Sequence, residues 1–336
     1  MDFTKRKIIA ELGMTHDGSL GQAKAMIRAA AECGVDAVKL QTHISEAETI
    51  RNAPQPPYFK AEPRYEYFKR TAFSMEQWRE CRECAAENGV EFISSPFSIE
   101  AVKLLQELGT DAYKIPSGEI TNIPYLEYLA SCNVPIIISS GMSSLKELDE
   151  CMEIFLNNNC NIVLMQCTSE YPCTPEKVGL NVLDLFREKY PGVPLGFSDH
   201  TPGEWASIGA FIKGARVIEK HFTLSKKMYG PDAKMSLEPD EMAQLCDSIK
   251  NLECALVHPV DKTDVTSFEE MKTIFQKSIV AACEIPEGTV ITEGMLGYKK
   301  PGTGLETRYY REIIGKKALR ALHFDEMIRL EDVGEQ

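Results

Sequence analysis

Segments with the apolar pattern of strands alternate with helix-like segments over most of this chain, and the alternation repeats eight times. The strand candidates are Lys7–Gly13, Asp36–His43, Glu91–Phe97, Asp111–Glu119, Val134–Met142, Asn161–Pro172, Val193–Thr201 and Ala215–Thr223. Between them, Ser74 and Gln77 predict a capping box, and Gly34 and Gly109 stand where helices end. Eight such rounds in about 260 residues match a (β/α)8 barrel, so we predict a TIM barrel over residues 1–260.

The pattern changes after the eighth round. Residues 261–277 are polar and predict a linker, whereas residues 278–336 combine short strand-like runs with many glycine turns. A β-rich domain of roughly sixty residues with few large apolar side chains is marginal on its own. We therefore expect this small domain to dock on another surface.

Composition narrows the class of protein. A net charge of −13 argues against general nucleic-acid binding and leaves any anionic substrate to a local basic pocket. No segment approaches eighteen uninterrupted apolar residues, so no membrane span is expected. Eleven scattered cysteines, an odd number, suit a reducing compartment, and we expect a cytoplasmic protein.

Polar side chains gather where the predicted strands end. In barrels of this kind the active site lies at the carboxyl ends of the strands, so ionisable groups belong there. The strand ends carry Glu11, Lys39, Gln41, Ser95, Lys114, Ser117, Glu119, Ser139, Thr168, Ser169, Tyr171, Ser198, His200, Glu219 and His221. Every predicted strand contributes to this rim.

Two histidines end neighbouring strands. His200 and His221 would therefore lie several ångströms apart at the barrel mouth, a workable separation for two ligands of one divalent ion. Two protein ligands leave open positions for substrate. The simpler alternative is that each histidine is a hydrogen-bonded core residue.

Two lysines and several hydroxyls share the same rim. Lys39 and Lys114, with the serines around them, suggest a phosphate or carboxylate site in an otherwise acidic protein. Alternatively, these lysines only pair with Glu11 or Glu119. A third possibility is that a desolvated lysine forms a Schiff base, as in an aldolase.

Long motifs along essentially the whole chain resemble, in order, those of the sialic acid synthase family, among them IIAELGMTHDGS, DAVKLQT, FISSPF, AYKIPSGEITN, GFSDHT, VIEKHFTL and KKPGTG. That family condenses phosphoenolpyruvate with an N-acylated mannosamine-type sugar. The tail resembles the family's antifreeze-like domain, or SAF domain, which covers the partner's barrel in a domain-swapped homodimer. The resemblance thus implies a TIM barrel followed by a small β-rich SAF domain.

The resemblance also implies roles for individual residues. The divalent metal, Mn²⁺ or Mg²⁺, would be bound by His200 and His221. Phosphoenolpyruvate would be held by Lys39, Ser95, Lys114, Ser117, Ser139, Ser169 and Ser198. The amino sugar would be held or acted on by Glu11, Gln41, Glu119, Tyr171 and Asp232, with Lys300 of the tail approaching the partner's pocket. Ser169 stands where an asparagine is common in the family, and Lys300 where many members have arginine. As catalytic residues we single out Glu119, which would handle protons, together with Glu11 and Lys114.

The predicted reaction joins phosphoenolpyruvate, N-acetylmannosamine and water to give N-acetylneuraminate and phosphate. An alternative acceptor is the 6-deoxy-diacetamido sugar 2,4-diacetamido-2,4,6-trideoxymannose, which would give N,N'-diacetyllegionaminate. Gly118 follows Ser117, at a position where pseudaminic-type relatives more often have a bulky aromatic residue. The glycine therefore favours these two acceptors over a pseudaminic-type sugar. A Schiff-base aldolase and a non-catalytic binding protein remain as the competing hypotheses.

Overall fold

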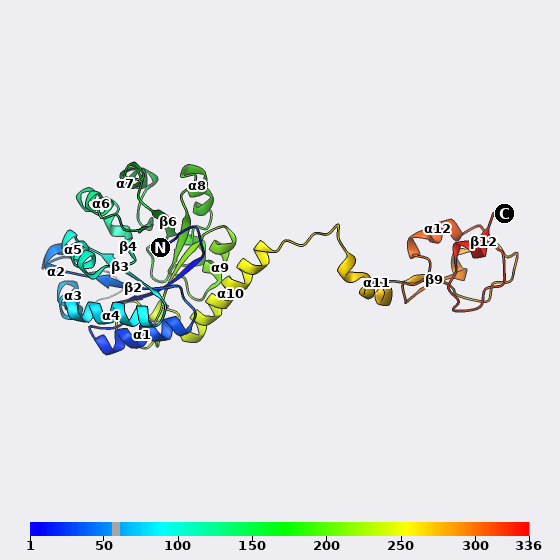
Figure 1. The fold of residues 1–336 in the computed structure, drawn as a ribbon, viewed down its shortest axis with the longest axis horizontal. Coiled ribbons are helices and arrows are strands. Elements are labelled where there is room, and N and C mark those ends of the chain that lie inside the picture. The colour runs from blue at the N-terminus through cyan, green and yellow to red at the C-terminus, as the bar shows by residue number, and fades with distance from the viewer. Residues whose placement is uncertain (56–60, 336) are drawn as a thin grey trace. The chain divides into compact units, whose positions relative to one another are not determined.

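The structure, a computed structural model, describes residues 1–55 and 61–335. These residues form two compact units, Met1–Val257 and His258–Gln336 (Figure 1). The predicted barrel boundary at residue 260 thus lies just beyond the end of the first unit.

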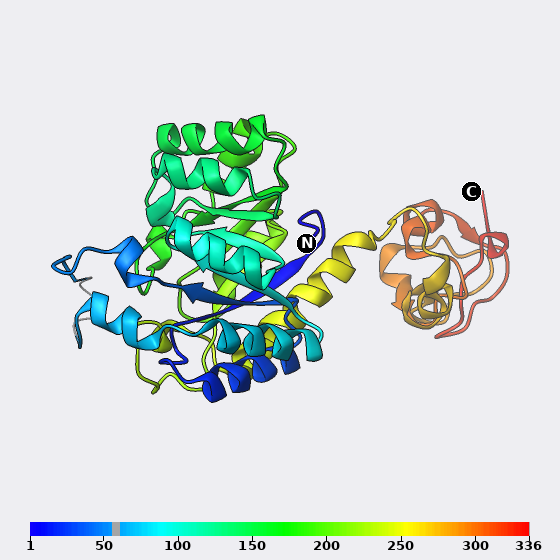
Figure 2. The ribbon, with the colours of Figure 1, turned by 60° about the vertical axis from the view of Figure 1, so that its left-hand side comes forward.

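The first unit is a closed barrel of eight parallel strands in sequence order, which confirms the predicted TIM barrel (Figure 2). Its strands are β1 (Lys7–Gly13), β2 (Ala37–Thr42), β3 (Glu91–Pro96), β4 (Ala112–Ile115), β5 (Ile136–Ser139), β6 (Ile162–Cys167), β7 (Leu195–Asp199) and β8 (Val217–His221). Strands β1 and β8 close the barrel in a register that sets Glu11 opposite His221. Parallel pairing brings all the carboxyl ends of the strands to one rim.

Helices connect the strands. They are α1 (Leu20–Glu32), α2 (Ser45–Glu48), α3 (Arg64–Thr71), α4 (Met75–Glu87), α5 (Ile99–Leu108), α6 (Ile123–Ala130), α7 (Leu145–Asn157), α8 (Val182–Lys189), α9 (Trp205–Ile212) and α10 (Pro239–Val257). The predicted capping box of Ser74 and Gln77 begins α4, and Gly109 ends α5 in the left-handed conformation. Helices α2 and α3, between β2 and β3, are additional to the eight predicted rounds. Among the described helices, none is both long and apolar enough to span a membrane.

The barrel interior has two layers of different chemistry. One layer is apolar and consists of Phe3, Ile9, Ala37, Ile93, Ala112, Ile137, Val163, Met165 and Val217. Two residues further along the same strands stand Glu11, Lys39, Ser95, Lys114, Ser139, Cys167 and Glu219. Because side chains alternate between the faces of a strand, residues two apart share the interior. The apolar layer is thus the floor on which the polar rim is built.

The second unit has its own small core. Its elements are α11 (Glu269–Phe275), β9 (Ser278–Ala281), β10 (Leu296–Lys299), α12 (Tyr310–Ile313), β11 (Lys317–Ala318) and β12 (Val333–Gly334). Strand β9 pairs with β10 and β11 with β12, both antiparallel. The segment predicted as a linker, residues 261–277, carries α11. Buried side chains such as Ile279, Ile313 and Ile328 form the core, which confirms a small β-rich domain at this end of the chain.

Candidate active site

A cavity of about 350 Å³ opens among the carboxyl ends of the barrel strands, which is within the size range of small-ligand sites. Its lining includes every predicted site residue of the barrel: Glu11, Lys39, Gln41, Ser95, Lys114, Ser117, Glu119, Ser139, Ser169, Tyr171, Ser198, His200, His221 and Asp232. Lys300 belongs to the second unit, where its Nζ lies 4.7 Å from the centre of the Phe275 ring.

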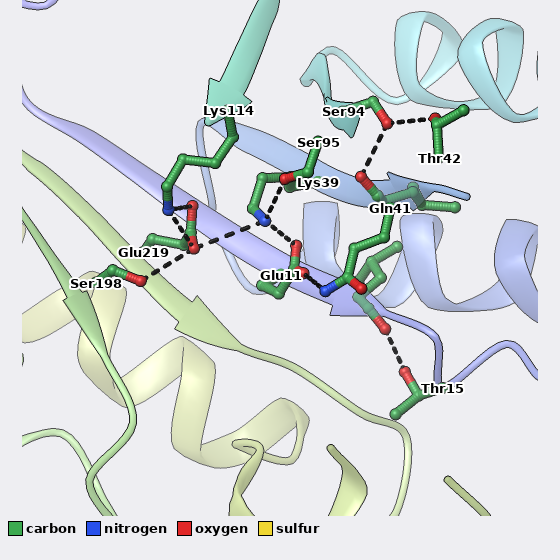
Figure 3. A network of polar contacts seen from close by, with 12 residues as sticks. Glu11, Thr15, Lys39, Gln41, Thr42, Ser94, Ser95, Lys114, Ser198 and Glu219 are labelled. Atoms are coloured by element: carbon green, nitrogen blue, oxygen red, sulfur yellow. Dashed lines mark hydrogen bonds and ion pairs between the residues drawn. The ribbon is translucent and has the colours of Figure 1, made fainter. Parts of the chain in front are cut away.

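Two buried ion pairs meet in this cavity (Figure 3). Lys39 Nζ lies 2.8 Å from Glu11 Oε2, and Lys114 Nζ lies 2.8 and 2.9 Å from the two oxygens of Glu219. The pairs are joined, because Lys39 Nζ is also 3.7 Å from Glu219 Oε1. Hydroxyl groups complete the network: Ser95 Oγ lies 3.1 Å from Lys39 Nζ, and Ser198 donates to Glu219.

The two glutamates differ electrostatically. Burial tends to raise the pKa of Glu219, but Lys114 and Lys39 outweigh it and hold that pKa at about 2. Burial and the nearby Glu219 raise the pKa of Glu11, against the opposing effect of Lys39. Glu219 is therefore a fixed negative charge, whereas Glu11 takes up a proton more readily.

The two histidines lie side by side, with ring centres 5.4 Å apart. His200 Nδ1 lies 2.8 Å from the Thr168 carbonyl oxygen, so Nδ1 carries a proton and Nε2 is the nitrogen left to face a metal. Burial lowers the pKa of His200, but Cys167 and the Thr168 carbonyl outweigh it, and the net direction is upward. His221 Nδ1 is buried and has no hydrogen-bond partner among the described residues. Burial and the adjacent His200 place the pKa of His221 well below its usual value, so its ring is neutral, the form that binds metals.

These observations fit a divalent ion at the histidine pair. An orphaned imidazole nitrogen beside a second imidazole could supply two of the ligands of such an ion. In the described part of the chain, no three His, Cys, Asp or Glu side chains are arranged to hold a metal. The other coordination positions would therefore fall to water or substrate.

The residues that precede the histidines form a buried ion pair on the other side of the strands. Lys220 Nζ lies 3.0 Å from Asp199 Oδ2, and both side chains are fully buried. Asp199 also accepts hydrogen bonds from the Thr201 amide and the Ser207 hydroxyl. The run of ionisable residues at the end of β8 thus divides by strand alternation: Glu219 and His221 line the cavity, and Lys220 anchors β8 to β7.

Serine hydroxyls crowd the wall formed by β4, β5 and β6. Ser117 Oγ donates to Ser139 Oγ over 3.2 Å. A Cβ at Gly141 would lie 2.3 Å from both Ser117 Oγ and Ser169 Oγ, closer than any real contact. Only glycine at this position lets the two hydroxyls approach each other, and they form a polar cradle suited to an anion.

Two further acids, Glu119 and Asp232, line the cavity. Burial raises the pKa of Glu119, which accepts a hydrogen bond of 2.8 Å from Asn122. Burial and the neighbouring Glu11 raise the pKa of Asp232 to about 6. Raised carboxyl pKa values in a cavity are typical of groups that exchange protons near neutral pH.

Several cavity residues had no predicted role, although Glu219 was expected at the rim. Glu219 is central, and its position two residues before His221 on one strand is the signal that places it inside the barrel. His43, Arg64, Phe68 and Phe97 form another part of the lining. Arg64 and Phe68 come from α3, which the strand–helix alternation does not predict, and Arg64 Nε is buried without a partner among the described residues.

Comparisons with known proteins identify the family to which this chain is similar. The model of the NeuB family matches residues 26–261, and that of the SAF domain matches residues 276–334. The chain is 38% identical to the N,N'-diacetyllegionaminic acid synthase of Campylobacter jejuni, over 97% of this chain and 99% of that protein. It is 37% identical to the human N-acetylneuraminate-9-phosphate synthase, over 96% and 90%.

A solved structure shows the same relationship. The N-acetylneuraminic acid synthetase of Leptospira borgpetersenii superimposes with a TM-score of 0.69 at 29% identity, covering 80% of this chain and 90% of that one. Family model, sequence relatives and fold all point to one group of proteins. The chain belongs to the NeuB family, that of the nonulosonic acid synthases, and joins a TIM barrel to a SAF domain.

Proposed function

We propose that this chain condenses phosphoenolpyruvate with N-acetylmannosamine and water, giving N-acetylneuraminate and phosphate. The observation that carries the proposal is the joined pair of lysines beside two adjacent histidines in one cavity of a NeuB-family barrel. The alternative acceptor is 2,4-diacetamido-2,4,6-trideoxymannose, since one relative is named a diacetyllegionaminic acid synthase.

The charge balance of the cavity supports a metal as part of this site. Three cationic side chains line it, namely Lys39, Lys114 and Arg64, against four acidic ones, namely Glu11, Glu119, Glu219 and Asp232. A phosphate ester bearing a carboxylate adds further negative charge, which is costly in a buried site without a counter-ion. Mn²⁺ or Mg²⁺ at His200 and His221 would offset this charge and, when bound, supply Lewis-acid polarisation of the sugar aldehyde.

The protein residues bind the two substrates and exchange protons with them. Lys39, Lys114 and the serines Ser95, Ser117, Ser139, Ser169 and Ser198 hold the carboxylate and phosphate of phosphoenolpyruvate, and thereby orient its methylene carbon. That carbon bonds to the aldehyde carbon of the sugar, water adds to the phosphate-bearing carbon of phosphoenolpyruvate, and phosphate leaves from the same carbon. Glu119, with its raised pKa, exchanges protons in these steps, while Glu11, Gln41, Tyr171 and Asp232 hold the sugar.

The same geometry disfavours a Schiff-base aldolase. An amine nucleophile must be neutral, and Lys114 is bound by both oxygens of Glu219. Burial lowers the pKa of Lys39, but Glu11 and Glu219 outweigh it, and the net direction is upward. Lys39 is therefore held as a cation, and Lys114 is engaged in an ion pair, an arrangement that suits anion binding.

The function is tested by phosphate release. Purified protein supplied with phosphoenolpyruvate, Mn²⁺ and each of the two sugars in turn should release phosphate with at least one sugar. Product mass identifies the nonulosonic acid. Consumption of pyruvate in place of phosphoenolpyruvate, with an imine trapped by borohydride, would instead establish the aldolase.

The metal proposal predicts that His200→Ala and His221→Ala each lower turnover by about a hundredfold or more, because each removes one of two protein ligands. Metal content after dialysis, measured by elemental analysis, should fall in parallel, while the thermal midpoint stays near that of the parent. Full metal content in both variants would contradict the two-histidine site.

The anion site predicts a selective effect at Lys114. Replacing this lysine alone leaves Glu219 under-compensated and should destabilise the fold by roughly 3 kcal/mol, as measured by urea denaturation. The double variant Lys114→Met with Glu219→Gln removes both charges and should recover much of that stability. Its KM for phosphoenolpyruvate should nevertheless rise about tenfold more than its KM for the sugar. Equal changes in the two KM values would assign the lysine another role.

We further propose a domain-swapped homodimer in which Lys300 reaches the sugar end of the partner's cavity. Exposed apolar side chains support it: Phe268, Met271 and Phe275 are each more than half exposed, and a second copy would bury them.

Mixing a His200→Ala chain with a Lys300→Ala chain tests the swap. A swapped heterodimer contains one site with both lesions and one with neither, so activity should exceed that of either variant alone. Heterodimers confirmed by mass but without such recovery would mean that Lys300 does not serve the partner's site.

A further inference from the structure

His43 is a buried histidine that the proposed chemistry does not use. It lies just past the end of β2, and only 6% of its surface is exposed. Its ring is stacked between Phe68, with centres 3.6 Å apart and planes at 6°, and Phe97, at 4.1 Å and 22°. Arg64 covers the outer face of Phe68, with its guanidinium carbon 5.3 Å from the ring centre. The column fixes the plane of the imidazole, and therefore the directions of its two nitrogens.

Both ring nitrogens of His43 have polar partners. Nδ1 lies 2.9 and 3.0 Å from the two oxygens of Glu48, and Nε2 lies 3.1 Å from Oε1 of Gln41. At its other end, the carboxamide of Gln41 donates from Nε2 to Glu11 Oε1 over 2.6 Å. A chain of hydrogen bonds thus runs from Glu48 through His43 and Gln41 to Glu11.

The donor and acceptor roles in this series of hydrogen bonds follow from its end at Glu11. Glu11 also pairs with Lys39, so its carboxylate accepts, and the amide nitrogen of Gln41 must face it. The amide oxygen then faces His43, so His43 Nε2 must carry a proton. The other ring nitrogen, Nδ1, faces the Glu48 carboxyl group. Burial lowers the pKa of His43, against the opposing effect of Glu48.

We propose that His43 is a positioning residue for the acceptor sugar, which it influences by holding the carboxamide of Gln41 in one orientation. This inference rests on the proposed function. With its oxygen engaged by His43 and one N–H by Glu11, Gln41 has a single N–H left for a ligand in the cavity. It therefore selects an oxygen acceptor on the sugar, either a hydroxyl or an acyl carbonyl. In the reverse orientation, the amide oxygen would be set against the Glu11 carboxylate.

The test replaces the imidazole but keeps the aromatic column. His43→Phe retains a ring between Phe68 and Phe97 and loses the Nε2 donor. The expected result is a rise of about tenfold in KM for the sugar, with KM for phosphoenolpyruvate within about twofold of the parent. His16→Phe is the matched control: His16 is also buried and packs on Phe73, but it does not line the cavity, so both KM values should stay unchanged.

A double-mutant cycle distinguishes positioning from a general structural effect. If His43 acts through Gln41, His43→Phe should add nothing to the sugar KM in a Gln41→Ala background. Additive effects of the two substitutions would overturn the inference. Should His43→Phe not fold, His43→Gln and His43→Leu give the same comparison without a ring, and the glutamine, which retains an N–H donor, should give the lower sugar KM.

The outcomes separate the two proposals. An active parent protein whose sugar KM is unchanged in His43→Phe, or equal in His43→Gln and His43→Leu, overturns the role of His43 alone. A parent protein that releases no phosphate with any acceptor overturns the proposed function, and the inference with it.

Discussion

Four buried charges, Lys39 with Glu11 and Lys114 with Glu219, form the interaction on which the rest of this site depends. A buried ion costs several kcal/mol unless a partner and further hydrogen bonds compensate it. Here the partners come from β1, β2, β4 and β8, so compensation requires the barrel to be closed. The register that sets Glu11 opposite Lys39 on one side and His221 on the other links the charge cluster directly to the histidine pair.

With its charges paired in this way, a site for a multiply charged anion can fold before its ligand binds. Each of the two lysines already has a carboxylate partner, so neither amine is an uncompensated buried charge. Under the proposed function, an arriving phosphate ester would share the lysines with Glu11 and Glu219 and need little rearrangement of the protein, which is the usual advantage of a preorganised polar site. Because Glu11 and Glu219 already offset the charge of the lysines, a metal ion at the histidines would strengthen the binding of such an anion.

The barrel and most of the rim follow from strand periodicity, which is a local property of the sequence. Glu11, Lys39 and Lys114 were predicted because each ends an apolar run, and the closed barrel brings such ends together. The pairing of Lys114 with Glu219 was not predictable in this way, because it crosses the barrel interior and depends on side-chain reach. The wall made by Arg64 and Phe68 was also missed, since α3 is an addition to the eight rounds, and its contact with His43 is visible only in three dimensions.

Helix α3 takes no part in the hydrogen bonding that closes the barrel, yet it supplies one wall of the cavity. Because α3 lies outside the hydrogen bonding of the barrel, its sequence can change without disturbing the strands that carry the ion pairs and the histidines. Under the proposed function, such changes would alter the acceptor side of the cavity and leave the lysines and serines assigned to the phosphate ester in place. The names of the relatives, one a diacetyllegionaminic acid synthase and another an N-acetylneuraminate-9-phosphate synthase, are consistent with such divided inheritance.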